Sequence, residues 1–360
     1  MTHTPRFKQT YIDFVVEEHL PYSLTKKGTR FYVQLEKKNT NTMDLLKRIM
    51  KEFGFSRKHI GIAGLKDKHA LAKQRFCFHG NDIKKIGEKS FLYDLGKISS
   101  VITTGYSHVP LWLGSMITNQ FRIRLKYDQP LPQEKKSQLE ARFATLMSQW
   151  FGNTFGEQRF GVSRQNHRIA QDILKGGKAH LSLSEKMFKL QAYASWLFNN
   201  YLSYRLKQHG KISLLEGDIV VDPGQQSYLL ALPQGNFSSI AQRKDKGFFV
   251  TATPRQVPIE NNKLKEVSIT WALIGYNILL SPPLSVAGKL EQERLIHFEL
   301  TPEHLHLFKT YKIFGLRRPL RVVPKSSTLT RQGNDLLLSF ILPKSAYASV
   351  VVDSLLQETD

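Results

Sequence analysis

The stretch Gly61-Ile62-Ala63-Gly64-Leu65-Lys66-Asp67-Lys68-His69-Ala70 places one carboxylate between two lysines, directly after an apolar, glycine-rich run. Nearby cations favour the ionised form of an acid, and glycines let other groups approach the backbone closely. An aspartate in this setting suits chemistry on a polyanion. The same pattern is also typical of a turn that carries a solvated charge cluster, because charged side chains are mostly exposed.

Composition indicates what kind of partner the chain has. Its 360 residues include 52 Lys and Arg against 30 Asp and Glu, which gives a formal net charge of +22 at pH 7. This excess is larger than solubility requires and indicates a polyanionic partner, most simply nucleic acid. An acidic membrane surface is the alternative. However, the sequence has no run of about 18 apolar residues, and its basic residues do not gather on one amphipathic helix.

Sequence signatures of metal and nucleotide sites are absent. The twelve histidines show no metal-ligand spacing, and Gly176-Gly177-Lys178 lacks the upstream glycine of a phosphate-binding loop. We therefore expect no metal and no cofactor. Cys77 is the only cysteine and lies in an apolar run, so we expect it to be buried, which suits a reducing cytosol. Residues 1–8 contain no apolar signal core, and we expect a cytoplasmic protein.

Hydrophobic periodicity predicts an α+β fold. Residues 7–37 have the alternation of extended structure. A helix is predicted to begin at Asn41 or Thr42 and to end at Gly54. A long helix is predicted from about residue 186 to residue 207, and a last helix from about residue 347 to residue 357. Because strands and helices do not alternate regularly, we expect mainly antiparallel sheets.

Three further segments follow the Asp67 motif in a fixed order. They are Asn119-Gln120-Phe121-Arg122-Ile123, then Asn153-Thr154-Phe155-Gly156-Glu157-Gln158-Arg159-Phe160-Gly161, and finally Leu342-Pro343-Lys344-Ser345-Ala346-Tyr347-Ala348-Ser349-Val350. Together with residues 63–70, they resemble the motifs of the tRNA pseudouridine synthase D (TruD) family, in order and in spacing. The resemblance extends from about Lys8 to the end of the chain, and residues 63–70 are similar to the family's catalytic motif.

The chain departs from the family pattern at a few positions. Thr154 stands where the family usually has Tyr, and Ser345 replaces a Gly. Val352-Asp353 falls where an Arg-Glu pair is common, and His69 to Ala72 lack the usual Thr. None of these changes involves Asp67.

The resemblance implies a pseudouridine-synthase catalytic core with a mixed, mainly antiparallel sheet, interrupted by an inserted family-specific (TRUD) α+β domain. The core would comprise residues 1–153 and 303–360, and the inserted domain residues 154–302. The implied activity is the isomerisation of a uridine to pseudouridine, at uridine 13 of tRNA. Other RNA substrates, or a non-catalytic RNA-binding protein or chaperone on the same fold, are the alternatives. No membrane and no obligate protein partner is implied.

The resemblance also implies which residues form the site. Asp67 is the catalytic group, and its role as nucleophile or base stays open. A stacked uridine must flip out to reach it, and Phe121 is expected to receive the base unless it is an ordinary core residue of its strand. Lys66 and Lys68 could hold Asp67 ionised or contact phosphate, although one of them is expected to be only solvated. The complete set of expected substrate or RNA contacts is Lys8, Lys66, Asn119, Phe121 and Tyr347.

Overall fold

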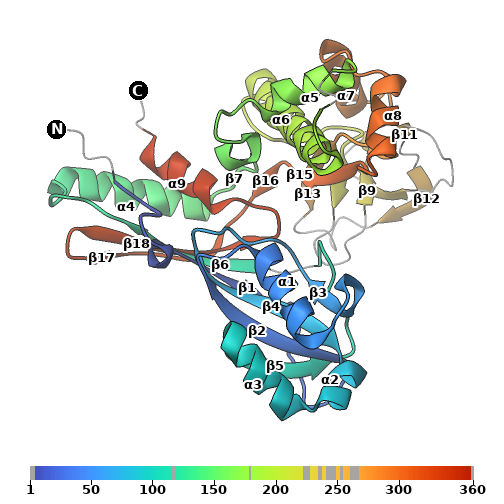
Figure 1. Cartoon of the computed structure of the whole chain (residues 1–360). Helices are drawn as coiled ribbons and strands as arrows, with labels where there is room; N and C mark the ends of the chain where they lie inside the picture. Colours follow the sequence, from blue (N-terminus) through green and yellow to red (C-terminus); the bar gives the residue numbers. More distant parts are fainter. Residues whose placement is uncertain are drawn as a thin grey trace. The chain divides into compact units, whose positions relative to one another are not determined.

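The computed structural model describes residues 5–115, 118–177, 180–221, 228–233, 237–240, 249–251, 254–259 and 267–357 (Figure 1). The chain divides into two compact units. The first runs to Trp150, resumes at Val323–Ala348 and includes the chain from Val352 onward, and the second comprises Phe151–Val322 with Ser349–Val351.

A mixed, mainly antiparallel sheet of eight strands forms the centre of the first unit (Figure 1). Its order is β17-β18-β6-β1-β4-β2-β5, with β3 paired to β4. Only the pairing of β1 with β4 is parallel among the pairings described for this sheet. The strands are β1 (Phe14–His19), β2 (Arg30–Lys38), β3 (Ile60–Ile62), β4 (Leu71–His79), β5 (Ser100–Ser107), β6 (Thr118–Leu125), β17 (Lys325–Gln332) and β18 (Asp335–Pro343).

Helices cover one face of this sheet at its β2 and β4 end. Side chains alternate between the faces of a strand, and Phe31, Val33 and Leu35 of β2 pack with Leu45 and Ile49 of a helix in one apolar cluster. That helix follows Asn41 and ends at Gly54, whose φ is +65°, as the sequence predicted. The helices of this unit are α1 (Thr42–Phe53), α2 (Gly80–Ile86), α3 (Glu88–Ile98) and α4 (Gln133–Ser148); α9 (Ala348–Leu356) closes the described chain, and short 3-10 turns occur at Tyr11–Asp13 and Arg57–His59.

The second unit contains a six-stranded sheet in the order β12-β10-β9-β8-β13-β15 and two small sheets, β11-β14 and β16-β7. The long helix predicted from residue 186 to residue 207 is confirmed as α6 (Leu183–His209). Its buried Arg205 forms an ion pair with the buried Asp218, with 2.6 Å between Nη2 and Oδ2. The strands are β7 (Phe151–Gly152), β8 (Ile219–Val221), β9 (Tyr228–Ala231), β10 (Phe237–Ile240), β11 (Phe249–Thr251), β12 (Pro254–Ile259), β13 (Ser268–Leu273), β14 (Ile278–Leu280), β15 (Leu316–Pro319) and β16 (Arg321–Val322); the remaining helices are the 3-10 turn Glu157–Phe160, α5 (Asn166–Leu174), α7 (Val286–His297) and α8 (Pro302–Thr310).

The second unit extends further along the chain than the sequence predicted for the inserted domain. The predicted end was residue 302, whereas the unit continues to Val322. Pairing explains the difference, because β15 adds to the edge of the sheet beside β13 and β16 pairs with β7. Residues 316–322 are therefore held in the second unit by strand pairing, and residues 303–315 fall in the same compact unit.

Candidate active site around Asp67

Asp67 lies in the loop that joins β3 to β4, and buried polar side chains hold this loop. The Oγ1 atom of Thr42 accepts a hydrogen bond from the backbone N–H of Lys66 at 3.0 Å and donates one to Oε1 of Gln74 at 2.9 Å. The amide nitrogen of Gln74 in turn donates to the carbonyl of Gly64 at 2.7 Å. Thr42 and Gln74 are both buried. The backbone on the N-terminal side of Asp67 is therefore fixed to α1 and β4.

Lys37 holds the backbone of Asp67 itself. Its Nζ donates to the carbonyl of Asp67 at 2.6 Å and to the carbonyl of Thr40 at 2.8 Å. Lys37 is only 2% exposed, and it lies on the face of β2 that also presents Leu35 to the core. Burial lowers its pKa to about 8, although the nearby Asp67 carboxylate acts in the opposite direction.

The carboxylate of Asp67 faces Lys8 of the N-terminal segment. The Asp67 side chain is 43% exposed, and its Oδ2 lies 2.9 Å from Nζ of Lys8. The same Nζ lies 4.0 Å from the centre of the Phe14 ring. Lys8 has a φ of +58°, in the left-handed region that costs an ordinary residue about 1–2 kcal/mol. Such strain persists where the surroundings fix it, often at functional sites.

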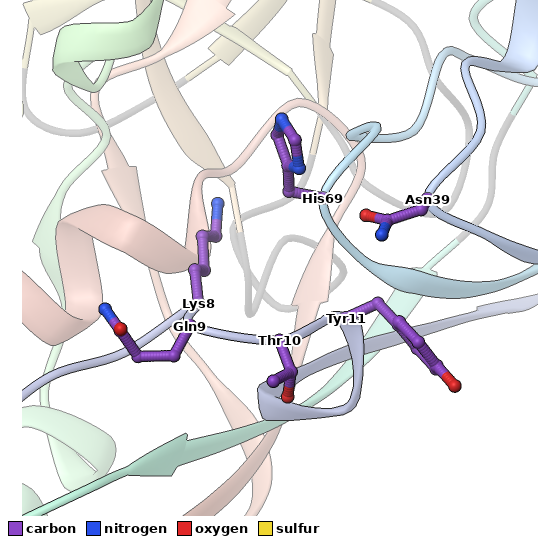
Figure 2. A pocket seen from close by; sticks show the side chains of 6 residues that line it. All are labelled: Lys8, Gln9, Thr10, Tyr11, Asn39 and His69. Atoms are coloured by element: carbon purple, nitrogen blue, oxygen red, sulfur yellow. The ribbon is translucent and has the colours of Figure 1, made fainter.

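A pocket of about 290 Å³ opens beside this ion pair. It is lined by Lys8, Gln9, Thr10, Tyr11, Asn39 and His69 (Figure 2). Figure 2 shows Lys8 rising from the N-terminal segment, and His69 extending from the loop that carries Asp67. The pocket therefore joins three separate parts of the chain beside the carboxylate.

Lys66 turns inward to a different acid. Its Nζ lies 2.7 Å from Oε1 of the fully buried Glu18, and the Lys66 side chain is 10% exposed. The same Nζ donates to Oδ1 of Asn119 at 2.9 Å. The other Glu18 oxygen accepts from the backbone N–H of Arg75 at 2.9 Å. Lys66 thus connects the Asp67 loop to β1 and β6, whereas Lys68 is exposed.

Phe121 lies two residues beyond Asn119 on the same face of β6. It pairs with Val16 of β1 and with Phe340 of β18. The centre of its ring is 5.8 Å from the ring of Phe14 and 5.8 Å from the ring of Phe340. With 7% exposure, Phe121 presents little of its ring to solvent.

Tyr347 is half-buried in the segment after β18, directly before α9. The C-terminal end of β18 pairs with β6 at Leu342 and Asn119, which brings this segment to the same end of the sheet. The structure thus joins Asp67 with Lys8, and Lys66 with Asn119, by direct contacts. Tyr347 lies four residues after the end of β18, at the same end of the sheet as Asn119.

Sequence reasoning missed Lys37, Glu18, Thr42 and Gln74. A signal existed for Lys37, because it continues the two-residue period of Phe31, Val33 and Leu35 into a position where a charge is costly. Glu18 continues the period of Phe14 and Val16 in the same way. A charged residue at an apolar position of a strand therefore marks a buried contact.

The described residues contain no group of three or more His, Cys, Asp or Glu side chains able to hold a metal ion. In the same part of the chain, every helix is too short or too polar to span a bilayer.

Comparison with known proteins shows the family of this chain. The sequence model of the family described as tRNA pseudouridine synthase D (TruD) matches residues 3–180 and 177–355. The chain belongs to the TruD family. Among curated TruD proteins, that of Sulfurimonas denitrificans is 28% identical over 97% of this chain and 94% of its own length. That of Photobacterium profundum is 29% identical over 96% of this chain and 90% of its own length.

A solved structure agrees in fold. The crystal structure of a candidate TruD protein from Methanosarcina mazei matches with a TM-score of 0.62 and 18% identity, over 100% of this chain and 95% of that chain. The predicted fold class, an α+β protein of the TruD type with a mixed and mainly antiparallel sheet, is confirmed.

Lys37→Met is expected to flatten the alkaline stability profile of this TruD protein. Burial lowers the pKa of Lys37 to about 8, against about 10.4 for a free lysine. Between these values the unfolded chain binds one more proton than the folded chain, so the free energy of unfolding rises with pH as the buried charge is removed. The Lys37→Met variant should lack this rise in the free energy of unfolding. Urea unfolding at several values between about pH 7 and pH 10 measures it.

Lys38→Met is the matched control, because the Lys38 side chain is 50% exposed at the next position. Parallel stability profiles for the wild type and Lys37→Met would show that Lys37 does not carry a destabilised charge.

Proposed function

We propose that this chain is a tRNA pseudouridine synthase that isomerises a flipped-out uridine, at position 13 of tRNA, with Asp67 as the catalytic group. One observation carries the proposal. A partly exposed carboxylate faces a strained lysine at 2.9 Å, in a motif loop whose backbone is fixed by the buried Lys37. The names of the curated relatives supply the substrate, tRNA.

The chemistry needs no external reagent. The bond between N1 of uracil and C1′ of ribose breaks, a bond between C5 and C1′ forms, and the proton on C5 is lost while N1 gains one. An isomerisation of this kind balances without a cofactor. Lys8 orients Asp67 through Oδ2, and Oδ1 has no partner among the described residues, so this oxygen is available to the uridine as a base or a nucleophile.

The neighbouring residues receive roles in the same proposal. Phe121 supports the extruded base, since flipped bases are held against apolar or aromatic side chains, and Asn119 and Tyr347 line the same end of the sheet. The contacts of Lys66 with Glu18 and Asn119 support a positioning role for it, in place of the two predicted roles, which were to hold Asp67 ionised or to contact phosphate. A non-catalytic RNA-binding protein would have no use for a strained lysine aimed at a carboxylate.

The direct test is to map pseudouridine in tRNA transcripts incubated with the purified protein. We expect one new pseudouridine, at position 13, in the transcripts that serve as substrates. Modification elsewhere with position 13 unchanged would keep the reaction class and change the substrate. No modification of any RNA would leave the alternative of an RNA-binding protein or chaperone.

The affinity for tRNA is expected to fall steeply with salt. The chain carries a formal charge of +22, and each phosphate that it neutralises releases counterions, so log affinity falls by about 0.7 to 0.9 per decade of salt for each phosphate. Fluorescence anisotropy with labelled tRNA, titrated at several salt concentrations, measures the slope. An affinity that does not change with salt would contradict a surface that follows the phosphate backbone.

A further inference from the structure

A second pocket, of about 450 Å³, lies in the first unit. The alternation of side chains along β4 places it on the opposite face of the sheet from Phe121, because its lining includes Cys77 and His79 whereas Phe76 and Phe78 face the helices. Five of its lining side chains are basic, and none is acidic. The basic ones are Arg30, Arg57, Lys58, His59 and His79.

The wall of this pocket is a braced turn that exposes a tryptophan. The backbone N–H of Trp112 donates to Oγ of Ser115 at 2.9 Å, and the N–H of Ser115 donates to the carbonyl of Trp112 at 3.0 Å. Gly114 allows the turn with a φ of +88°. Trp112 nevertheless remains 57% exposed. Leu113 beside it is 59% exposed and Val109 is 43% exposed, and an exposed group of apolar side chains is typical of a binding surface.

Close packing fixes the floor of the pocket. The carbonyl of Leu111 covers Gly61 so closely that a Cβ atom at Gly61 would lie 2.1 Å from it. Cys77 is buried, as the sequence predicted, and burial raises the pKa of its thiol. The floor is therefore tightly packed and preformed.

The cations of the pocket are oriented and lack acidic partners. Nη1 of Arg57 donates to the carbonyl of Ile60 at 2.5 Å, and Nη1 of Arg30 lies 2.6 Å from Nε2 of His79. Because a guanidinium only donates, Nε2 of His79 is the acceptor in this contact. In the part of the chain that the structure describes, neither arginine nor Lys58 forms an ion pair.

We propose that this pocket binds one nucleotide of the substrate RNA, outside the reacting uridine. The guanidinium and ammonium groups hold its phosphate, since guanidinium forks match phosphate oxygens, and its base stacks on Trp112. The N–H of Gly114 donates to the carbonyl of Ala63 at 2.9 Å, so the Trp112 turn is joined to the start of the Asp67 loop. An RNA held on the turn is thereby positioned relative to that loop. The proposal rests on the proposed function only in taking RNA as the ligand.

Trp112→Ala is expected to weaken binding of a tRNA transcript by about five- to a hundredfold, the effect of losing one stacked base. The double variant Arg57→Gln with Lys58→Gln should reduce the slope of log affinity against log salt by about 0.7 to 0.9, the contribution of one phosphate. All three side chains are exposed, so the variants should keep the melting temperature of the wild type.

Tyr93→Ala combined with Lys97→Gln is the matched control. This pair is also an exposed aromatic ring and a cation in the first unit, with 4.2 Å between Nζ of Lys97 and the centre of the Tyr93 ring. It lies on α3, and its loss should leave affinity and salt slope unchanged. Trp112→Phe should restore most of the affinity that Trp112→Ala loses.

The proposal would be overturned if both pocket variants bound tRNA with the affinity and the salt slope of the wild type and of the control. Failure of the proposed function gives a different result: binding that depends on Trp112, with no pseudouridine formed. Quenching of protein fluorescence by a short oligouridylate provides a second measurement. We expect quenching in the wild type and its loss in Trp112→Ala.

Discussion

Asp67→Asn is expected to abolish pseudouridine formation, with a fall in the single-turnover rate of about 10²- to 10⁴-fold or more. The amide has the shape of the carboxylate but can act neither as a base nor as a nucleophile in this reaction. Binding of tRNA should persist or tighten, because the change removes a negative charge from a strongly basic chain. Stability should change little, since the Asp67 side chain is 43% exposed. The single-turnover rate and the dissociation constant are measured on the same preparation.

Asp128→Asn is the control for the change in charge. Asp128 is an exposed acid in the first unit that pairs with Arg6 rather than with the motif loop. Its variant should isomerise uridine at the wild-type rate. If Asp67→Asn turned over at nearly the same rate as Asp128→Asn, another group would have to perform the chemistry.

Local sequence signals predicted α1, α6 and α9, whereas α2, α3, α5, α7 and α8 were not predicted. The stop of α1 at Gly54 and the extent of α6 follow from residues within a few positions of each helix end. At the start of α6, Ser182 and Glu185 form a capping box, a signal that depends on three-residue spacing alone. Such features are fixed before any tertiary contact forms, and so they can be predicted from the sequence.

Sheet order could not be predicted in this way. The parallel pairing of β1 with β4 joins Val16 to Ala72, and nothing in either segment specifies the other. The end of the second unit has the same cause. Residues 316–322 form short strands, and only their partners, β13 and β7, assign them to that unit. Which strands pair depends on which faces of the whole sheet are buried. The sequence of a single strand does not contain that information.

In the candidate site, too, some contacts could be predicted from the sequence and others could not. The motif match selected Asp67 and Lys8, which the structure brings into contact although 59 residues separate them. The two lysines beside Asp67 in sequence do not contact its carboxylate, because Lys66 reaches the buried Glu18 instead and Lys68 is exposed. The buried carboxylate of Glu18 needs a cation as its partner and pairs with Lys66. That Glu18 lies near Lys66 is known only from the fold.

Phe121→Ala is expected to lower the free energy of unfolding by about 3–5 kcal/mol. The ring is 7% exposed and packs between Phe14 and Phe340, so truncation leaves a cavity in the apolar face. If Phe121 also supports the flipped uridine, the turnover of the folded molecules should fall by about five- to a hundredfold, the effect of losing one stacked base. Urea unfolding and turnover, measured on the same sample, separate the two effects.

Ile123→Ala provides the comparison that decides between packing and pocket. Ile123 is buried two residues further along β6 and on the same face, where it pairs with Phe14 and Leu338. Its truncation should cost about 2–5 kcal/mol through the same cavity effect, yet its folded molecules should isomerise uridine at the wild-type rate. A Phe121→Ala protein whose folded fraction also works at that rate would show that Phe121 only packs the sheet. A turnover loss confined to Phe121→Ala would place its ring against the reacting base.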